Sequence, residues 1–206
     1  MTKYLTQWTM DDVESVGLLK IDFLGIRYLT MVSSIVEQIK KENPEFNITK
    51  INYKDPKVYN LFAEGTTEGI FQFESSGMKE KLRLLKPTEF NDIVAMNALY
   101  RPGPMAQIET YIRRKHGEEK VNYPHPNLEK ILKDTYGVIV YQEQIMLIAV
   151  NFAHMSLNEA DNMRRAVSKK KKEDLEYYGR IFIEKSVAAG YDRNVAKSLF
   201  DLIVTF

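Results

Sequence analysis

The sequence predicts a mainly α-helical fold with small β elements. Apolar residues recur at helical spacings of three and four through most of the chain, and prolines, glycines and capping residues separate the resulting segments. Apolar residues make up 44% of the chain, including 12 Tyr and 10 Phe, which is enough for a packed core and too much for a disordered tail. Only short runs resemble strands, so any β structure is expected to be minor.

The first regular element predicted is a strand. Residues 1–16 are polar and mixed, and the apolar run that follows, Gly17–Leu24, is typical of a short buried strand ended by Gly25. In such a strand Lys20 and Asp22 share one face, because side chains alternate. The pair fits either the solvated face of an edge strand or part of a site for phosphate chemistry.

Helices are predicted through the middle of the chain, where apolar spacing and stop signals agree. Asp55-Pro56 supplies an N-cap and a first-turn proline, and Pro87 ends the segment before a helix that Thr88 can cap. The predicted helices have these apolar faces: Leu29, Val32, Ile35, Val36 and Ile39, ended by Asn43-Pro44; Val58, Leu61 and Phe62, ended by Gly65; Met78, Leu82 and Leu85; a helix to about Leu99; and Ile108, Tyr111 and Ile112.

Two prolines flank a glycine in Tyr100–Met105, which predicts a rigid elbow. The elbow fits a plain connector between helices, and it would also place Arg101 well for holding an anion. The run Gly69–Glu74 is too short to separate strand from turn. The run Gly137–Tyr141 is predicted as a second strand, and it leads directly into a helix that starts at Gln142.

The C-terminal third is predicted to be helical. Ser156 and Glu159 form a capping box, so a helix is expected from Leu157. A helix from about Glu173 to Ala189 follows, and Asp192 can cap another. The apolar face of this last helix comprises Val195, Leu199, Leu202, Ile203 and Phe206. Its pattern runs to Phe206 without a C-cap, which suggests a fragment of a longer protein.

Basic side chains concentrate in Met163–Lys172 of a chain whose net charge is only +1. A phosphate-rich partner is one interpretation. A solvated helix end is the other, since lysines favour the negative pole of the helix dipole. The dipole does not explain Arg164 and Arg165, which lie upstream inside the helical pattern. We therefore separate this arginine pair from the lysine run, Lys169, Lys170, Lys171 and Lys172.

Several classes of protein are excluded or disfavoured. The chain has no cysteine, so disulfides and thiolate metal sites are ruled out. No apolar run approaches the roughly 20 residues of a membrane span, and no signal pattern begins the chain, so a soluble intracellular protein is expected. There is no phosphate-binding glycine loop, and His116, His125 and His154 lack metal-ligand spacing. Asp22 alone is one carboxylate, fewer than two-metal catalysis requires.

Ordered motifs give the sequence a resemblance to a known family. Leu19–Gly25, Phe71–Met78, Arg101–Pro104, Tyr136–Gln144 and Ala160–Ala166 resemble, in this order, segments of bacterial family C replicative DNA polymerases, the DnaE-type alpha subunits of DNA polymerase III. The resemblance covers essentially the whole chain. It implies that residues 1–27 are the C-terminal edge of the palm and that residues 28–206 are a helical fingers domain, truncated at its end.

The resemblance also implies roles for individual residues. Asp22 would be a catalytic carboxylate and ligand of Mg²⁺, and Lys20, Arg101, Arg164 and Arg165 would bind the substrate dNTP. The lysine run Lys169–Lys172 would contact nucleic acid. Partners would be the primer-template and, through regions absent here, the sliding clamp and other replisome subunits, in the cytoplasm and with no membrane.

The sequence contains no second apolar strand with a D-x-D pair, the motif that carries the other two catalytic aspartates in the family. We therefore expect the chain to be inactive as a polymerase by itself. Two non-enzymatic alternatives stay open: a helical nucleic-acid-binding module, and a protein-interaction domain whose lysines are only surface. Lys20 and Asp22 favour the polymerase, since a simple binder has no need of this pair on a core strand.

Overall fold

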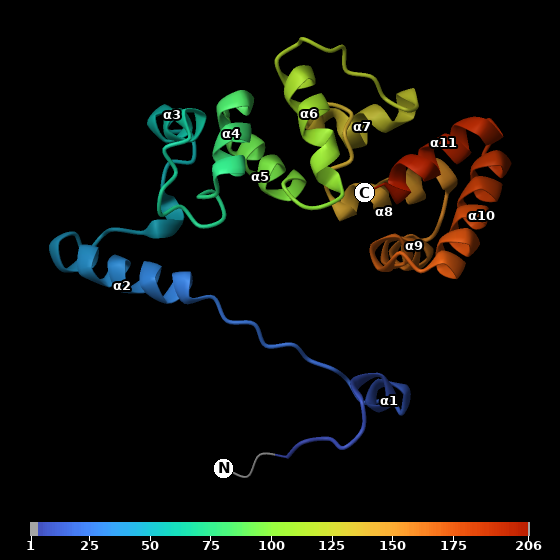
Figure 1. Cartoon of the computed structure of the whole chain (residues 1–206), viewed down its shortest axis with the longest axis horizontal. Helices are drawn as coiled ribbons and strands as arrows, with labels where there is room; N and C mark the ends of the chain where they lie inside the picture. Colours follow the sequence, from blue (N-terminus) through green and yellow to red (C-terminus); the bar gives the residue numbers. More distant parts are fainter. Residues whose placement is uncertain (1–3, 206) are drawn as a thin grey trace. The chain divides into compact units, whose positions relative to one another are not determined.

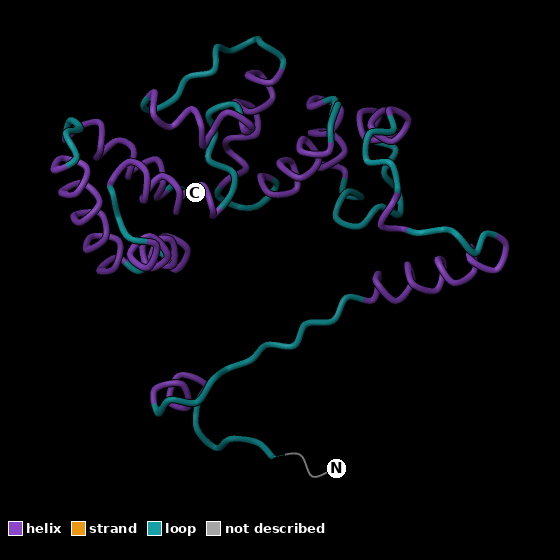
Figure 2. Tube along the Cα trace, turned by 180° about the vertical axis from the view of Figure 1, so that it is seen from behind, coloured by secondary structure: helices purple, strands orange, loops and turns teal. Residues whose placement is uncertain are grey.

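The structure, a computed structural model, describes residues 4–205, and Phe206 of the last predicted apolar face lies outside this range. The chain divides into two units, residues 1–51 and residues 52–206, and each is described by itself (Figure 1). Every regular element of the described residues is helical, and Figure 2 shows helices and loops alone. The mainly helical prediction is confirmed, and the predicted small β elements are wrong.

The first unit holds α1 (Met10–Ser15), α2 (Arg27–Glu42) and a short 3₁₀ turn, η1 (Ile48–Lys50). The helix predicted from Leu29 to Ile39 is confirmed as α2. Neither α1 nor α2 has a buried residue, and Leu29 on the apolar face of α2 is 68% exposed. The first unit therefore lacks a core of its own among the described residues.

The strand predicted at Gly17–Leu24 is absent. Residues 18–26 have no regular secondary structure, and Phe23 is 92% exposed. A strand is stabilised by backbone hydrogen bonds to a neighbouring strand, and the described residues provide no such neighbour. Alternation of apolar residues predicts which side chains share a face, but it does not supply the partner. Lys20 and Asp22 do point the same way, with Nζ and Oδ2 3.6 Å apart.

The second unit consists of helices joined by turns and by two longer loops, residues 65–75 and 116–125. Three of its predicted starts are confirmed by side-chain caps, at Asp55, Ser156 and Asp192. Its helices are α3 (Pro56–Glu64), α4 (Ser76–Leu85), α5 (Phe90–Leu99), α6 (Ile108–Lys115), α7 (Glu129–Leu132), α8 (Gln142–Ala153), α9 (Leu157–Lys169), α10 (Lys172–Ala188) and α11 (Arg193–Val204), with 3₁₀ turns η2 (Pro104–Gln107), η3 (Pro126–Leu128) and η4 (Lys133–Thr135). No helix of residues 4–205 is both long and apolar enough to cross a membrane.

Two local predictions for these helices need correction. Glu89, not Thr88, caps α5, because its side chain and that of Asp92 form a reciprocal capping box. Helix α3 buries Tyr59 and Phe62, whereas Val58 of its predicted apolar face is 47% exposed. The apolar pattern of a short helix leaves its rotation loosely defined, and packing against α4 selects the face.

Two hydrophobic cores stabilise the second unit. One comprises residues of α3 to α6, and the other comprises residues of α7 to α11. The segment predicted as the strand Gly137–Tyr141 joins them, since Val138 and Val140 enter the first core and Ile139 enters the second. This alternation resembles a strand, but the segment pairs with no other strand in the described chain. The strand prediction is therefore wrong, although residues 137–140 are buried and Tyr141 is partly buried.

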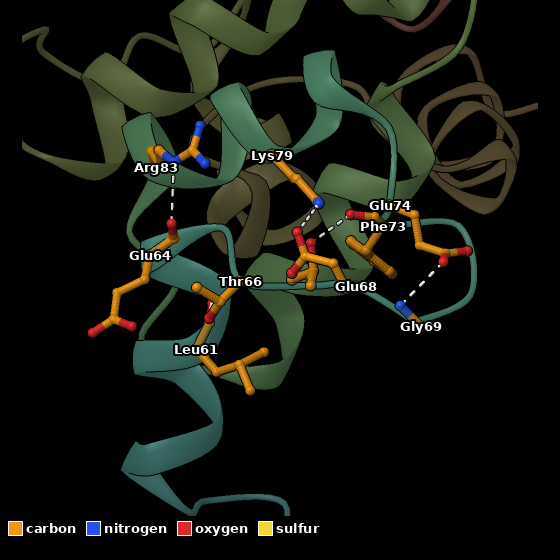
Figure 3. Close-up of polar contacts among 10 residues, drawn as sticks. Leu61, Glu64, Thr66, Glu68, Gly69, Phe73, Glu74, Lys79 and Arg83 are labelled. Atoms are coloured by element: carbon orange, nitrogen blue, oxygen red, sulfur yellow. Dashed lines mark hydrogen bonds and ion pairs between the residues drawn. The ribbon is translucent and has the colours of Figure 1, made fainter.

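The turn between α3 and α4 is fixed by its own polar contacts (Figure 3). The side chain of Thr67 donates to the carbonyl of Phe73 at 2.5 Å, and the Gly69 N–H donates to Glu74 Oε1 at 3.0 Å. Gln72 takes a left-handed backbone conformation, with φ of 69°. Gly69–Glu74 is therefore a turn, which settles the alternative left open by the sequence.

Candidate functional site

The predicted arginine pair lies on α9, whose start is set by the capping box. The Ser156 N–H donates to Glu159 Oε2 at 2.8 Å, and the Glu159 N–H donates to Ser156 Oγ at 3.3 Å. Lys185 of α10 reaches the same Glu159 oxygen at 2.8 Å. One carboxylate therefore caps α9 and joins it to α10, which fixes the direction in which the helix presents Arg164 and Arg165.

We predict that the charge on Glu159 contributes to stability in a pH-dependent way. The hydrogen bond from Lys185, followed by those from Ser156, lowers the pKa of Glu159 from its ordinary value of 4.5 to about 2. A lowered carboxyl pKa stabilises the fold above the unfolded pKa, and this contribution disappears as the pH falls from about 4.5 toward 2. Because the pair is partly exposed, we expect Glu159→Gln to lower the free energy of unfolding by about 0.5–1 kcal/mol at neutral pH.

Urea unfolding measured at a series of pH values tests this prediction. Gln keeps the capping hydrogen bond and loses only the charge, so the deficit should shrink as the pH falls. Glu176→Gln is the matched control, since the Glu176 carboxylate lies 3.9 Å from Lys172 at an exposed position. A deficit for Glu159→Gln that persists unchanged at the acid end would contradict the assignment.

Asp161 binds both predicted arginines from one turn earlier on α9. Arg164 donates to Asp161 Oδ1 through Nε at 3.0 Å and through Nη2 at 2.7 Å. Arg165 Nη2 lies 2.8 Å from Asp161 Oδ2, and its side chain is 62% exposed against 22% for Arg164. The hydrogen bond from Arg164 lowers the pKa of the Asp161 carboxyl, and the positive charges of both arginines lower it further. The three side chains together carry one net positive charge.

Arg164 also contacts the beginning of α8. Its Nη1 donates to Gln142 Oε1 at 2.9 Å, so α8 and Asp161 together hold the guanidinium in place. Neither Asp161 nor Gln142 was predicted as a site residue from the sequence. The spacing of Asp161, three and four residues before the arginines, was a usable signal, because such pairs meet on a helix surface. Nothing in the sequence places Gln142 against Arg164.

The predicted elbow is confirmed and lines a hollow. Gly103 has φ of 104°, a conformation suited to glycine, between Pro102 and the turn η2. The hollow has a volume of about 440 Å³ and is entirely within the second unit. Its lining residues are Ala98, Arg101, Pro102, Pro104, Val140, Tyr141, Gln142, Glu143, Val167, Ser168 and Lys170. Arg101 and Lys170 thus face one space, with Glu143 as the acid in its wall.

The lysine run forms the link between α9 and α10. Lys169 ends α9, Lys170 is its left-handed C-cap with φ of 51°, and Lys172 begins α10. The helix dipole favours the first two lysines at the end of α9, but it disfavours Lys171 and Lys172 at the start of α10. A solvated helix end therefore explains Lys169 and Lys170, but it does not explain Lys171 and Lys172. Of the four, Lys170 is the lysine that lines the hollow.

Lys20 and Asp22 belong to the first unit, and both are exposed. No group of three or more His, Cys, Asp or Glu between residues 4 and 205 is arranged to hold a metal. Asp22, with Lys20 as its ion-pair partner, therefore does not form a Mg²⁺ site within these residues. Any metal step would need carboxylates from outside this set.

The second unit is a helical domain with a hollow whose charged lining residues are Arg101, Lys170 and Glu143. The family model described as the bacterial DNA polymerase III alpha subunit finger domain matches residues 28–190. The chain is 53% identical over 206 residues to DNA polymerase III subunit alpha of Staphylococcus aureus (strain COL) and 54% identical over 204 residues to that of Bacillus subtilis (strain 168). The chain belongs to this polymerase family, and it spans 18–19% of the length of these two relatives.

Proposed function

We propose that this chain is the part of a DNA polymerase III alpha subunit that binds the triphosphate of the incoming dNTP and positions it against the primer-template. One observation carries the proposal: Arg101 and Lys170, far apart in the sequence, line a single hollow, and Gln142 in its wall accepts a hydrogen bond from Arg164. Charge-assisted hydrogen bonds from arginine suit phosphate oxygens. The relatives named above are polymerase subunits, and nothing in them favours a non-enzymatic binding module or a protein-interaction domain.

The parts of the site have different proposed roles. Arg101, Arg164 and Arg165 neutralise the triphosphate, Lys170 closes the same hollow, and the remaining lysines of the run contact the nucleic-acid backbone. Arg165 is the more available of the pair, because Arg164 is already held by Asp161 and Gln142. An incoming phosphate would therefore recruit Arg164 by competing with Asp161.

We further propose that residues 1–27 belong to the palm and that residues 28–206 form the fingers, supported by the start of the family match at residue 28. Asp22 would then be one Mg²⁺ ligand and catalytic carboxylate, with Lys20 near the phosphates. The remaining carboxylates of the catalytic set would come from sequence that this chain does not contain. The whole polymerase would act with the sliding clamp and other replisome subunits in the cytoplasm.

Titration of the full 206-residue chain with a dNTP, followed by calorimetry, tests the proposal. Each of Arg101→Ala and Arg164→Ala should weaken binding about tenfold or more, since a hydrogen bond to a charged group contributes roughly 1.5–3 kcal/mol. Binding should also fall as salt rises. Primer extension by the chain alone should give no incorporation.

Arg193→Ala is the matched control, because Arg193 lines a separate groove between α10 and α11. Its dNTP affinity should equal that of the parent chain. Equal affinity of the parent and the Arg101→Ala and Arg164→Ala variants would overturn the site. Metal-dependent incorporation by the chain alone would contradict the assignment of catalysis to absent carboxylates.

A further inference from the structure

We propose that Gly77 is a positioning residue for Arg101, acting through the side chain of Tyr100. The inference rests on the proposed function, in which Arg101 binds phosphate. Gly77 lies at the second position of α4 and has no direct part in the hollow. Because Gly77 has no side chain, the ring of Tyr100 can pack against α4 at this position. This contact fixes the position of Tyr100, the first residue of the elbow.

Space, not backbone conformation, explains why position 77 holds glycine. Its φ lies outside the left-handed region, so any residue could adopt its backbone. A Cβ built on Gly77 would lie 2.3 Å from Tyr100 Oη, far closer than carbon and oxygen can approach. Helix propensity alone favours alanine over glycine at a helical position. The sequence therefore keeps the weaker helix former where a larger residue would strike Tyr100.

Packing and hydrogen bonds restrain Tyr100 from moving away from Gly77. Its ring packs against the core of α3 to α6, and its N–H donates to the Met96 carbonyl at 2.9 Å as the C-cap of α5. The next residue, Arg101, donates to the Leu99 carbonyl at 2.8 Å and accepts from Met105 at 3.1 Å. A displacement of Tyr100 is thus transmitted directly to the elbow that carries Arg101.

Helix α4 cannot easily move away either. Met78, Leu82 and Leu85 on its inner face are at most 2% exposed. On its other side, as Figure 3 shows, Arg83 Nε donates to the Glu64 carbonyl at 3.0 Å, and Lys79 forms an ion pair with Glu68. With α4 fixed from both sides, a side chain at position 77 would be accommodated by Tyr100 and the elbow.

The experiment compares dNTP affinity of the full chain with that of Gly77→Ala, Tyr100→Phe and the double variant. We expect Gly77→Ala to bind about tenfold more weakly, a change of about 1.4 kcal/mol. The double variant should regain the parent affinity, since the nearest remaining ring atom, Cζ, would lie 3.4 Å from the new methyl, an ordinary contact. Gly25→Ala is the control, because that glycine has no atom within 4 Å of the added Cβ and no left-handed φ.

A second cycle separates positioning from general damage. In an Arg101→Ala background, Gly77→Ala should cause no further loss of dNTP affinity, because it acts through the missing side chain. An equal additional loss in that background would overturn the inference. So would failure of Tyr100→Phe to rescue Gly77→Ala.

A readout without ligand distinguishes this inference from the proposed function. The chain has no cysteine, so Met105→Cys can carry a single trifluoromethyl label beside the elbow. Its ¹⁹F resonance should shift in Gly77→Ala and return in the double variant. If the parent chain binds no dNTP, the proposed function fails while this resonance still tests the packing. If the chemical shift of this resonance is unchanged in Gly77→Ala, the inference fails, whether or not the chain binds dNTP.

Discussion

Replacing Asp92 with alanine is expected to lower the free energy of unfolding of the second unit by about 3–5 kcal/mol, the largest stability effect we predict. Asp92 is fully buried near the start of α5, and its Oδ2 lies 3.2 Å from the ammonium of Lys115 at the end of α6. The side chain of Lys115 is only 8% exposed. Removal of the carboxylate would leave a buried ammonium without its counter-charge.

The same oxygen also organises the turn before α5. It accepts from the Thr88 N–H at 2.8 Å and from the Glu89 N–H at 3.2 Å, so alanine would also remove the capping interactions. The other oxygen, Oδ1, is buried without a partner among the described residues. The charge of Asp92 also acts on Tyr111. Burial, and then the negative charge of Asp92, raise the pKa of Tyr111 well above its ordinary value.

Urea unfolding followed by far-ultraviolet circular dichroism measures this effect. The single tryptophan, Trp8, is 74% exposed in the first unit and would not report on α5. Lys115→Met should destabilise by a similar amount, since it leaves the carboxylate unpaired. The double variant Asp92→Asn/Lys115→Met should recover much of the loss, because neither charge remains buried. A loss below about 1 kcal/mol for Asp92→Ala, the level of an exposed pair, would show that the pair is solvated.

The contrast between Asp92 and the helix ends shows what sequence can predict in this chain. Asp55, Ser156 and Asp192 were identified as caps because a cap acts on N–H groups two or three residues away. The partner of Asp92 lies on another helix, and no local pattern links it to Lys115. Its burial and its role in joining α5 to α6 follow only from packing.

The candidate site shows the same division. The capped helix of Arg164 and Arg165 and the elbow at Arg101 were predicted from local rules, and the structure contains both. Local rules could not place the two elements together, because Arg101 and Lys170 line one hollow only through the packing of distant segments. The roles of these residues in binding dNTP stay predictions, as do those of Lys20 and Asp22 in the first unit.

Replacing Gln144 with leucine is the second large effect we predict, a loss of about 2–4 kcal/mol in the free energy of unfolding. Gln144 is 6% exposed, and its Oε1 accepts from the N–H groups of Val140 at 2.8 Å and Tyr141 at 3.0 Å. Its Nε2 donates to the Ile131 carbonyl and to Thr135 Oγ1. Leucine has nearly the same volume, so the change removes hydrogen bonds and leaves buried polar groups unpaired.

These hydrogen bonds also explain why the strand prediction failed at Gly137–Tyr141. The buried segment needs partners for its backbone, and a sheet would ordinarily supply them. Here the Gln144 amide binds the N–H groups of Val140 and Tyr141, while Thr135 Oγ1 donates to the Val138 carbonyl at 2.7 Å. The side-chain amide of Gln144 thus supplies hydrogen bonds that a neighbouring strand would supply in a sheet. Alternation of apolar residues is the same in both cases, so it cannot distinguish a strand from this segment.

Gln142→Leu is the matched control, with the same substitution on the same helix at an exposed position. Its amide accepts from Arg164 alone, so its unfolding free energy should stay within about 0.5 kcal/mol of the parent. Gln144→Leu should differ by several times that amount and should also weaken dNTP binding, because it loosens the start of α8 where Gln142 and Glu143 line the hollow. Equal stability of the two variants would mean that water, and not Gln144, satisfies the N–H groups of Val140 and Tyr141.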